Sequence, residues 1–285
     1  MPDTINYALK YASVVDTRFK QGALSQPVIN NYFDWVGVET VRIFSRDLVT
    51  LGNYSVTGAN RYGSPNELGN TYQEMQMTQD KAFTYTIDRK SEQDTNGTME
   101  AAATLAENID NVLIPAIDKY RFAKLVASAP ATGAVSGVNH TITGAITASN
   151  AYEEFLKATE ILDNDLAPQG GRIAIVSPKF YNLIKLDESF VKRGDMATMI
   201  AIRGIVGEID GIPVLKVPAS YLPEKVDFII TNPIAMVAPV KLQDFKIHVD
   251  PPGINGVLVE ARTRHDAFVL NKKKDAIVVH KAPTT

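Results

Sequence analysis

Residues 71–128 read TYQEMQMTQDKAFTYTIDRKSEQDTNGTMEAAATLAENIDNVLIPAIDKYRFAKLVAS. The first half alternates, with Phe83, Tyr85 and Ile87 on one face, which is typical of a half-buried β-strand. The second half, from about Thr98 to Ser128, repeats apolar residues at helical spacing and predicts a long helix. At 1.5 Å per residue, such a helix spans roughly 45 Å, more than the width of a small domain. This stretch therefore predicts an extended arm followed by a long spine helix.

The arm has too few apolar residues to form a core of its own. It contains a glycine- and asparagine-rich tip from Gly52 to Asn70, and the preceding residues, through Val41 and Ile43, predict a partner strand for residues 83–87. An isolated two-stranded ribbon is only marginally stable in water. We therefore expect this hairpin to lie on a neighbouring copy of the same chain.

Residues 148–232 carry helix and strand signals in alternation, which indicates an α/β unit. Asn150 and Glu153 predict a helix start similar to a capping box. Ser177 followed by Pro178 predicts a second helix start. Asp210-Gly211 lies between two apolar runs and is the strongest short hairpin signal in the chain. Within the long helix, Pro115 predicts a kink or a break, at a cost of about 3 kcal/mol if nothing compensates.

The order of these segments resembles that of the major capsid proteins of tailed bacteriophages, which have the HK97-type fold. The long helix closes on Pro-Ala-Ile-Asp-Lys-Tyr-Arg-Phe at residues 115–122, and similar segments follow at Arg172–Pro178, Gly211–Val214 and Asp266–Val269. The resemblance implies an α+β, HK97-like capsid fold with four parts. They are an N-terminal arm (residues 1–35), an extended β-hairpin or E-loop (36–90), a peripheral domain with the spine helix (91–147 and 233–285) and an axial domain (148–232).

The same resemblance implies a structural role without catalytic residues. Copies of the chain would form pentamers and hexamers of an icosahedral shell around double-stranded DNA, inside a virion assembled in the bacterial host cytoplasm. Separate scaffolding, portal and decoration proteins are possible partners. Two alternatives stay open: an encapsulin-like shell with a protein cargo, and a soluble α/β enzyme that acts through residues 148–232.

Composition agrees with a protein that encloses DNA without gripping it. The chain has 285 residues, a net charge of -3 and no cysteine, which excludes disulfides and thiolate metal sites. A basic patch or tail, expected of a protein that condenses nucleic acid, is absent. The sequence contains no apolar run long enough for a membrane span and no signal-peptide pattern at its start.

The N-terminal arm has a helical apolar pattern over residues 4–20. The residues at this spacing are Ile5, Ala8, Leu9, Ala12, Val15 and Phe19. A membrane-surface helix would need a stronger basic face. The pattern favours a helix docked on another subunit or on the body of its own chain.

Several residues are candidates for contacts between subunits. They lie at the hairpin tip, on the arm, and in a conspicuous loop similar in place to the peripheral-domain loop of the family: Asn53, Tyr54, Arg61, Tyr62, Tyr72, Lys81, Pro251, Pro252 and Asn255. Some family members cross-link a lysine such as Lys81 to an asparagine of another subunit. The basic run Lys272-Lys273-Lys274 is either a solvated turn between the last two strands or a DNA-facing contact.

Signals for catalysis or metal binding are weak. The histidines, His140, His248, His265 and His280, do not stand at metal-ligand spacing, and no Gly-x-Ser-x-Gly elbow occurs. The carboxylates Glu153, Glu154, Asp163 and Asp165 fit a solvated helix face and its end. We therefore expect no catalytic, cofactor-binding or metal-binding residue.

Overall fold

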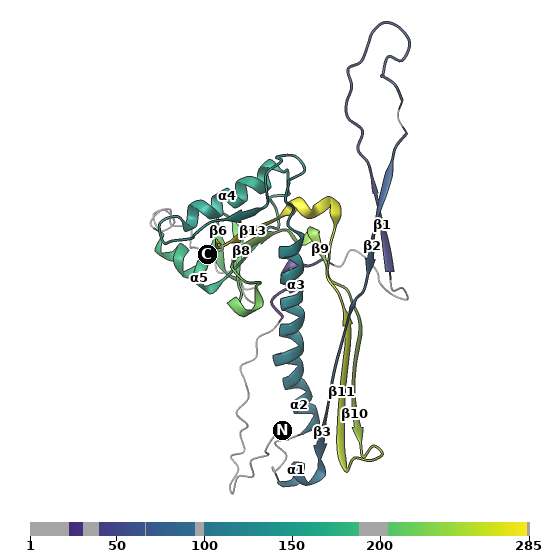
Figure 1. Cartoon of the computed structure of the whole chain (residues 1–285), viewed down its shortest axis with the longest axis vertical. Coiled ribbons are helices and arrows are strands. Elements are labelled where there is room, and N and C mark those ends of the chain that lie inside the picture. Colours follow the sequence, from purple (N-terminus) through teal and green to yellow (C-terminus); the bar gives the residue numbers. More distant parts are fainter. Residues whose placement is uncertain (1–22, 31–39, 66, 95–99, 188–204, 284–285) are drawn as a thin grey trace.

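The computed structural model describes residues 23–30, 40–65, 67–94, 100–187 and 205–283. It contains an α/β unit, a long helix, a long β-sheet beside that helix, and a hairpin that projects past them (Figure 1). The predicted helix of residues 4–20 lies outside the described ranges.

The α/β unit is built on a six-stranded sheet with strand order β4-β13-β8-β5-β7-β6. The strands are β4 (Thr141–Thr143), β13 (Ile277–Lys281), β8 (Val226–Thr231), β5 (Ile173–Val176), β7 (Ile212–Lys216) and β6 (Ile205–Ile209). Strands β5 and β8 are buried along their whole length. Burial of every residue of a strand requires cover on both faces of the sheet.

Helices supply this cover on the two faces. On one face, α4 (Ala151–Asn164) and α5 (Pro178–Leu186) pack Phe155 and Phe180 against Phe228 of β8. The rings of Phe180 and Phe228 are 4.6 Å apart between centroids. On the other face, the long helix packs Phe122 and its neighbours against Ile229. The α/β unit thus has an apolar core on each side of its sheet.

Local signals in this unit are mostly confirmed. The Ser177 side chain accepts a hydrogen bond from the Phe180 N–H at 3.2 Å, with Pro178 in the first turn of α5. Asp210 and Gly211 turn the chain between β6 and β7 with φ of 53° and 73°. The left-handed conformation of both residues is the one a tight hairpin turn requires.

The capping box expected at Asn150 was wrong, although α4 begins directly after it. The Asn150 carboxamide oxygen accepts from the N–H and hydroxyl of Thr147, and the Asn150 side chain makes no cap hydrogen bond. The Tyr152 N–H in the first turn of α4 instead donates to Asp187 Oδ2 at 3.0 Å. A carboxylate distant in sequence therefore satisfies one of the helix's free N–H groups.

The long helix has three consecutive segments: α2 (Ala101–Asn108), a π-helical segment η2 (Ile109–Leu113) and α3 (Ile114–Ser128). Together they span about 42 Å at 1.5 Å per residue. Pro115 lies in the first turn of α3, just after the π-helical segment. Because proline lacks an N–H and crowds the preceding turn, it requires a local change in the helix. The helix interruption predicted at Pro115 is therefore the π-helical segment η2.

Beside the helix lies an antiparallel sheet with strand order β10-β11-β3. Its strands are β10 (Val240–Val249), β11 (Gly256–His265) and β3 (Gln79–Asp88). The short helix α1 (Arg89–Asp94) follows β3. The middle strand β11 is buried against Leu105 of α2 through Val259 and Ala261.

The projecting hairpin consists of β1 (Thr40–Arg46) and β2 (Asn70–Gln76). The strand through Phe83 and Ile87, predicted to pair with Val41 and Ile43, pairs instead with β11 of the same chain. It does so because its apolar face is buried beneath the long helix, where the Tyr85 hydroxyl lies 2.9 Å from Thr104 Oγ1. Residues 79–90 were therefore wrongly included in the hairpin.

The predicted peripheral segments 91–147 and 233–285 also contain strands that pair elsewhere. Strands β4 and β13 are neighbours at one end of the six-stranded sheet, and β13 pairs with β8. Their assignment away from the α/β unit was wrong, because Val278 and Val279 of β13 are buried in its two cores. These two strands therefore belong to the six-stranded sheet, although they lie in the sequence segments that also contain the strands of the long sheet.

Short elements connect the parts. Strands β9 (Met236–Val237) and β12 (Phe268–Val269) form a small two-stranded sheet. Four 3-10 helices complete the described elements: η1 (Gln26–Val28), η3 (Ala219–Tyr221), η4 (Pro233–Ala235) and η5 (Asn271–Ala276).

Candidate inter-subunit surfaces

The hairpin base is fixed to the body of the chain. Met75 and Met77 are buried with Val237 and Leu270, and Val41 and Ile43 pack against this cluster. The Gln73 side chain donates to the carbonyl of Val269 at 2.9 Å and accepts from the Asn271 N–H at 2.9 Å. The base therefore has both apolar and polar support from the same chain.

Asp266 makes a second connection beneath the hairpin. Its carboxylate accepts hydrogen bonds from the N–H and hydroxyl of Thr78, which directly precedes β3. It also accepts from the Tyr120 hydroxyl of α3 at 2.6 Å. Burial and then the bond to Asp266 raise the pKa of Tyr120 to about 12, so the phenol remains a donor at neutral pH. The start of β3 is thus tied to the spine helix.

Beyond Asp47 and Gly69 the hairpin has no such support among the described residues. Leu48 and Leu51 are 95% and 103% exposed, and Tyr62 is 90% exposed. The other exposed large apolar residues of the hairpin are Phe44, Val49, Tyr54, Val56, Leu68 and Tyr72. Figure 1 shows this part of the chain extending away from every other element. Exposed large apolar side chains gathered on one segment are typical of a surface that contacts another molecule.

The structure brings four of the predicted contact residues together at the hairpin tip. Asn53, Tyr54, Arg61 and Tyr62 are all exposed there. The rings of Tyr54 and Tyr62 meet edge to face with centroids 5.0 Å apart, and the Ser55 N–H donates to the Arg61 carbonyl. The tip therefore presents a paired aromatic surface to its surroundings.

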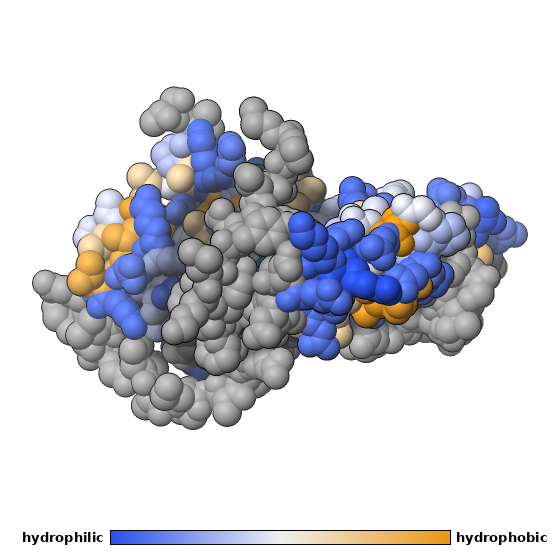
Figure 2. Space-filling model, turned by 90° about the horizontal axis from the view of Figure 1, so that it is seen from below, coloured by the Kyte–Doolittle hydropathy of each residue, from blue (hydrophilic) through white to orange (hydrophobic). Residues whose placement is uncertain are grey.

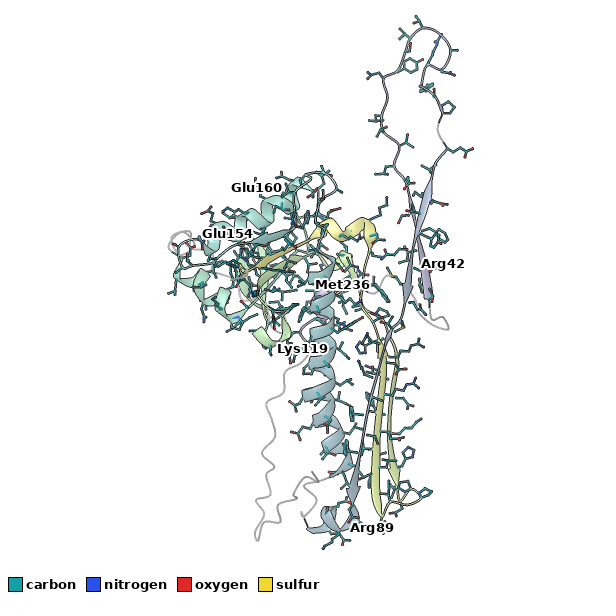
Figure 3. All side chains as sticks on the ribbon, in the orientation of Figure 1. Arg42, Arg89, Lys119, Glu154, Glu160 and Met236 are labelled. Carbon is teal, nitrogen blue, oxygen red and sulfur yellow. The ribbon has the colours of Figure 1, made fainter. Side chains whose placement is uncertain are left out.

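Tyr72 lies on β2, on the exposed side of the ribbon. The guanidinium of Arg42 lies 5.4 Å from the centre of its ring, and the ring of Phe44 is 6.2 Å away. Figure 3 shows Arg42 on the hairpin. It shows Arg89 at the end of the long sheet that is farther from the hairpin.

Lys81 is not on the hairpin. It lies on β3 opposite Thr263 of β11, beside a cavity between the sheet and the spine helix. Its predicted place on a projecting arm was wrong, for the same reason that the pairing of β3 was wrong.

Pro251, Pro252 and Asn255 lie in the turn between β10 and β11, at the far end of the long sheet. Pro252 and Asn255 are exposed. The turn is held by its own chain, because Arg89 forms an ion pair with Asp250 and donates its N–H to the Asn255 carbonyl. It is a fixed projection at the end opposite to the hairpin.

Lys272, Lys273 and Lys274 lie in η5, between β12 and β13. Lys272 Nζ is 3.7 Å from Asp47 Oδ1, just beyond the base of the hairpin. The expected turn between the last two strands is thus a short 3-10 helix.

The carboxylate of Asp165 is held by several structural partners within the chain. Asp165, expected on a solvated helix end, is buried and accepts hydrogen bonds from Ser136, Val135 and His140. Burial opposes its ionisation, but the Ser136 hydroxyl and N–H and then His140 hold the pKa of Asp165 well below its usual range. These bonds fix the loop before β4, a role that the sequence did not reveal.

Within the described ranges, no group of three or more His, Asp or Glu side chains is placed to hold a metal ion. Likewise, none of the described helices is long and apolar enough to cross a membrane.

A search of family models and of curated proteins gives no match. The fold, in contrast, is shared with phage structures, among them solved capsids, over nearly the whole chain. The capsid structure of cyanophage P-SCSP1u has a TM-score of 0.75 and 14% identity, covering 98% of this chain and 94% of that chain. A structure from Mycobacterium phage Che8 has a TM-score of 0.72 and 16% identity, covering 98% and 97%.

A third structure, the asymmetric unit of the mature capsid of bacteriophage PhiM1, has a TM-score of 0.71 and 13% identity, covering 98% of this chain and 93% of that one. At these identities the likeness establishes the fold. The predicted α+β fold is confirmed as one that this chain shares with phage capsid structures.

Proposed function

We propose that this chain is a major capsid protein that self-assembles into the icosahedral head of a tailed bacteriophage. The observation that carries the proposal is the projecting hairpin, whose exposed leucines and tyrosines lack cover from the described parts of their own chain. The likeness to phage capsid structures along the whole chain supports the same conclusion.

In the proposed shell, each hairpin lies on a neighbouring copy. One surface of the chain meets a different surface of the next copy, and such head-to-tail contacts close into rings when the rotation allows it. Pentamers and hexamers would form through the α/β unit as axial domain, and the long sheet and spine helix would act as peripheral domain. Many modest interfaces engaged at once would give the shell its stability.

The shell would hold double-stranded DNA without reading or gripping it. The net charge of -3 supports a wall that tolerates DNA. Lys272, Lys273 and Lys274 are the residues we would test for a weak inward contact. The chain itself would perform no catalysis, and portal, scaffolding and decoration proteins would be separate partners in a virion assembled in the bacterial cytoplasm.

Negative-stain microscopy of the purified chain tests this function. Hollow shells of uniform size are expected, alone or after co-expression with a scaffolding protein from the same source. A compact monomer under all these conditions would contradict the proposal. Nuclease-protected DNA in particles from infected cells would support a phage head, whereas a co-purified enzyme inside the shell would favour an encapsulin-like compartment.

The role of Lys81 in cross-linking is tested on the same particles. A denaturing gel of assembled shells should show only the single chain, because Lys81 lies on the long sheet and away from the hairpin. A ladder of covalent multimers that disappears in Lys81→Arg would establish the cross-link.

A further inference from the structure

A cavity of about 380 Å³ lies between the spine helix and the long sheet. Val112 and Leu113 of η2 and Ala116 of α3 form its helix side. Phe83 of β3 and Ala261 of β11 form part of its sheet side. Binding sites for small molecules typically enclose about 300–1,000 Å³ and have mainly apolar walls. The cavity therefore has the size and the walls of a site for a small, partly apolar ligand.

The helix wall of the cavity is not completed by the described chain. Val112 lines the cavity and is nevertheless 57% exposed. It lies in the π-helical segment η2, and such interruptions of α-helices occur frequently at functional sites. Figure 2 shows that hydrophobic residues of the described part reach the surface among hydrophilic ones. An apolar group from outside the described chain can therefore bury this wall.

The cavity becomes polar toward Thr263 and His265 of β11. Residues directly opposite one another in an antiparallel pair place their side chains on the same face of the sheet. Ala261 is opposite Phe83, and Thr263 and His265 follow it at the same alternation along β11. The His265 ring also meets the ring of Tyr120 of α3 edge to face, with centroids 5.9 Å apart. Both polar side chains thus lie on the helix side of the sheet, where the cavity is.

Two side-chain atoms in this polar part are buried without a partner. Thr263 and His265 are 1% and 3% exposed, and Thr263 Oγ1 and His265 Nδ1 have no hydrogen-bond partner among the described residues. Buried polar groups in native proteins are nearly always hydrogen-bonded. A hydroxyl and a ring N–H can both donate a hydrogen bond. An acceptor is therefore missing from this part of the cavity.

Lys81 adds a positive charge at the same place. It lines the cavity directly opposite Thr263, and it forms no ion pair with a described residue. Arg262, the other strongly basic residue of the lining, is neutralised by Asp80, with 2.6 Å between Nη2 and Oδ2. The charge that the described chain leaves unpaired at the cavity is therefore that of Lys81.

The charge of Lys81 also acts on His265. Burial and then the charge of Arg121 lower the pKa of His265, Asp266 acts in the opposite direction, and Lys81 lowers this pKa further. Since the ordinary pKa of histidine is about 6.5, the imidazole is neutral at pH 7. A bound anion would therefore face one positive charge, on Lys81, and two neutral groups that can donate.

We propose that this cavity binds a small amphiphile with a carboxylate head and an apolar chain, of the class of a medium-chain fatty acid. An ionised carboxylate only accepts hydrogen bonds, which suits Lys81, Thr263 and His265 as donors. Its single charge matches the single unpaired lysine, whereas a phosphate monoester carries about two. The apolar chain would lie between Val112 and Phe83. The proposal concerns the single subunit and does not rest on shell assembly.

Isothermal titration of the unassembled, full-length subunit with octanoate tests the proposal. We expect saturable binding of one molecule per chain. Because charge-assisted hydrogen bonds are roughly twice as strong as neutral ones, Lys81→Gln should weaken binding about tenfold, and octanol should bind to the wild type about tenfold more weakly than octanoate. The matched control is Lys246→Gln on the opposite face of the same sheet, where the lysine pairs with Asp244. It should leave the affinity unchanged.

Two further measurements locate the bound molecule. Ala116→Phe places a ring in the cavity and should abolish binding, whereas Ala123→Phe, at an exposed position outside the cavity lining on the same helix, should not. Both variants are compared with the wild type by thermal unfolding, so that loss of binding is not confused with loss of fold. In the wild type, octanoate should shift the imidazole nitrogen resonances of His265.

Three results would overturn the proposal. The first is the absence of saturable octanoate binding by the wild-type subunit. The second is equal affinity in the wild type and in Lys81→Gln, or equal affinity for octanoate and octanol. The third is a His265 resonance that changes only when particles assemble and never with octanoate, because the occupant would then be a side chain of a second copy.

Discussion

The hairpin and the six-stranded sheet are both made of β-strands, but they differ in where their apolar side chains lie. In the sheet, β5 and β8 are fully buried between helices of the same chain. In the hairpin, the seven-pair ladder of β1 and β2 ends at Arg46 and Asn70, and the large apolar residues beyond it are exposed. One region completes its core within the subunit, whereas the described chain leaves the large apolar residues of the other uncovered.

This difference predicts that one region determines the stability of the subunit and the other determines its assembly. Substitutions in the sheet should unfold the subunit, because buried apolar area is the main source of folding free energy. Substitutions at the hairpin tip should leave the subunit folded and change only what it binds.

Phe228→Ala should have the largest effect. Phe228 is fully buried and its ring packs against Phe155, Phe180 and His280. Loss of such a side chain typically costs about 3–5 kcal/mol of the free energy of unfolding. Denaturant unfolding of the soluble subunit measures this loss. A change below about 1 kcal/mol would mean that this core does not hold the subunit together.

Asp118→Ala should destabilise the subunit by about 2–4 kcal/mol. The substitution removes the acceptor for Leu24 and Ser25 and leaves Arg121 buried without its neighbouring carboxylate. Asp118→Asn is the matched control, since it keeps the shape and one acceptor oxygen and should lose less. The same unfolding experiment compares the two variants, and equal losses would argue against a role for the charge.

Acidification should weaken the packing between β11 and α3. His265 is the residue expected to cause this effect. Burial and then the nearby charge of Arg121 lower the pKa of His265, while Asp266 acts in the opposite direction. The unfolded state therefore binds the proton more readily, so the free energy of unfolding should fall as pH drops below about 6.5. His265→Gln should make this part of the pH dependence shallower. An identical pH profile in the variant would exclude His265 as its source.

The double variant Leu48→Ser, Leu51→Ser should have the smallest effect on subunit stability. Both side chains are already exposed to solvent, so the free energy of unfolding should change by less than about 0.5 kcal/mol. The yield of assembled particles should nevertheless fall at least tenfold, as measured by sedimentation. Normal assembly by this variant would show that Leu48 and Leu51 of the hairpin are not part of the proposed interface.

The sequence predicted best those features that depend on adjacent residues. The helix start at Ser177 and Pro178 and the turn at Asp210 and Gly211 require only local backbone chemistry, and both are confirmed. The long helix was recognised because its apolar repeat continues over many turns. The capsid fold itself followed from the order of segments, which no single motif established.

Features that depend on residues distant in the sequence could not be predicted from local patterns. The strand through Phe83 and Ile87 pairs with β11, more than 160 residues further along the chain. Asp165 is buried because the loop at Ser136 and His140 folds over it, and no pattern near Asp165 reveals this. Of the predicted contact residues, those at the tip were placed together, whereas Lys81 was assigned to the wrong element.

In the proposed shell, the hairpin gains its cover only from other copies of the chain. Amide hydrogen exchange of residues 47–69, compared between dissociated subunits and assembled particles, tests this directly. We predict rapid exchange in the subunit and at least tenfold protection in the particle, with β5 and β8 strongly protected in both. Equal protection of the hairpin in the two states would contradict the account.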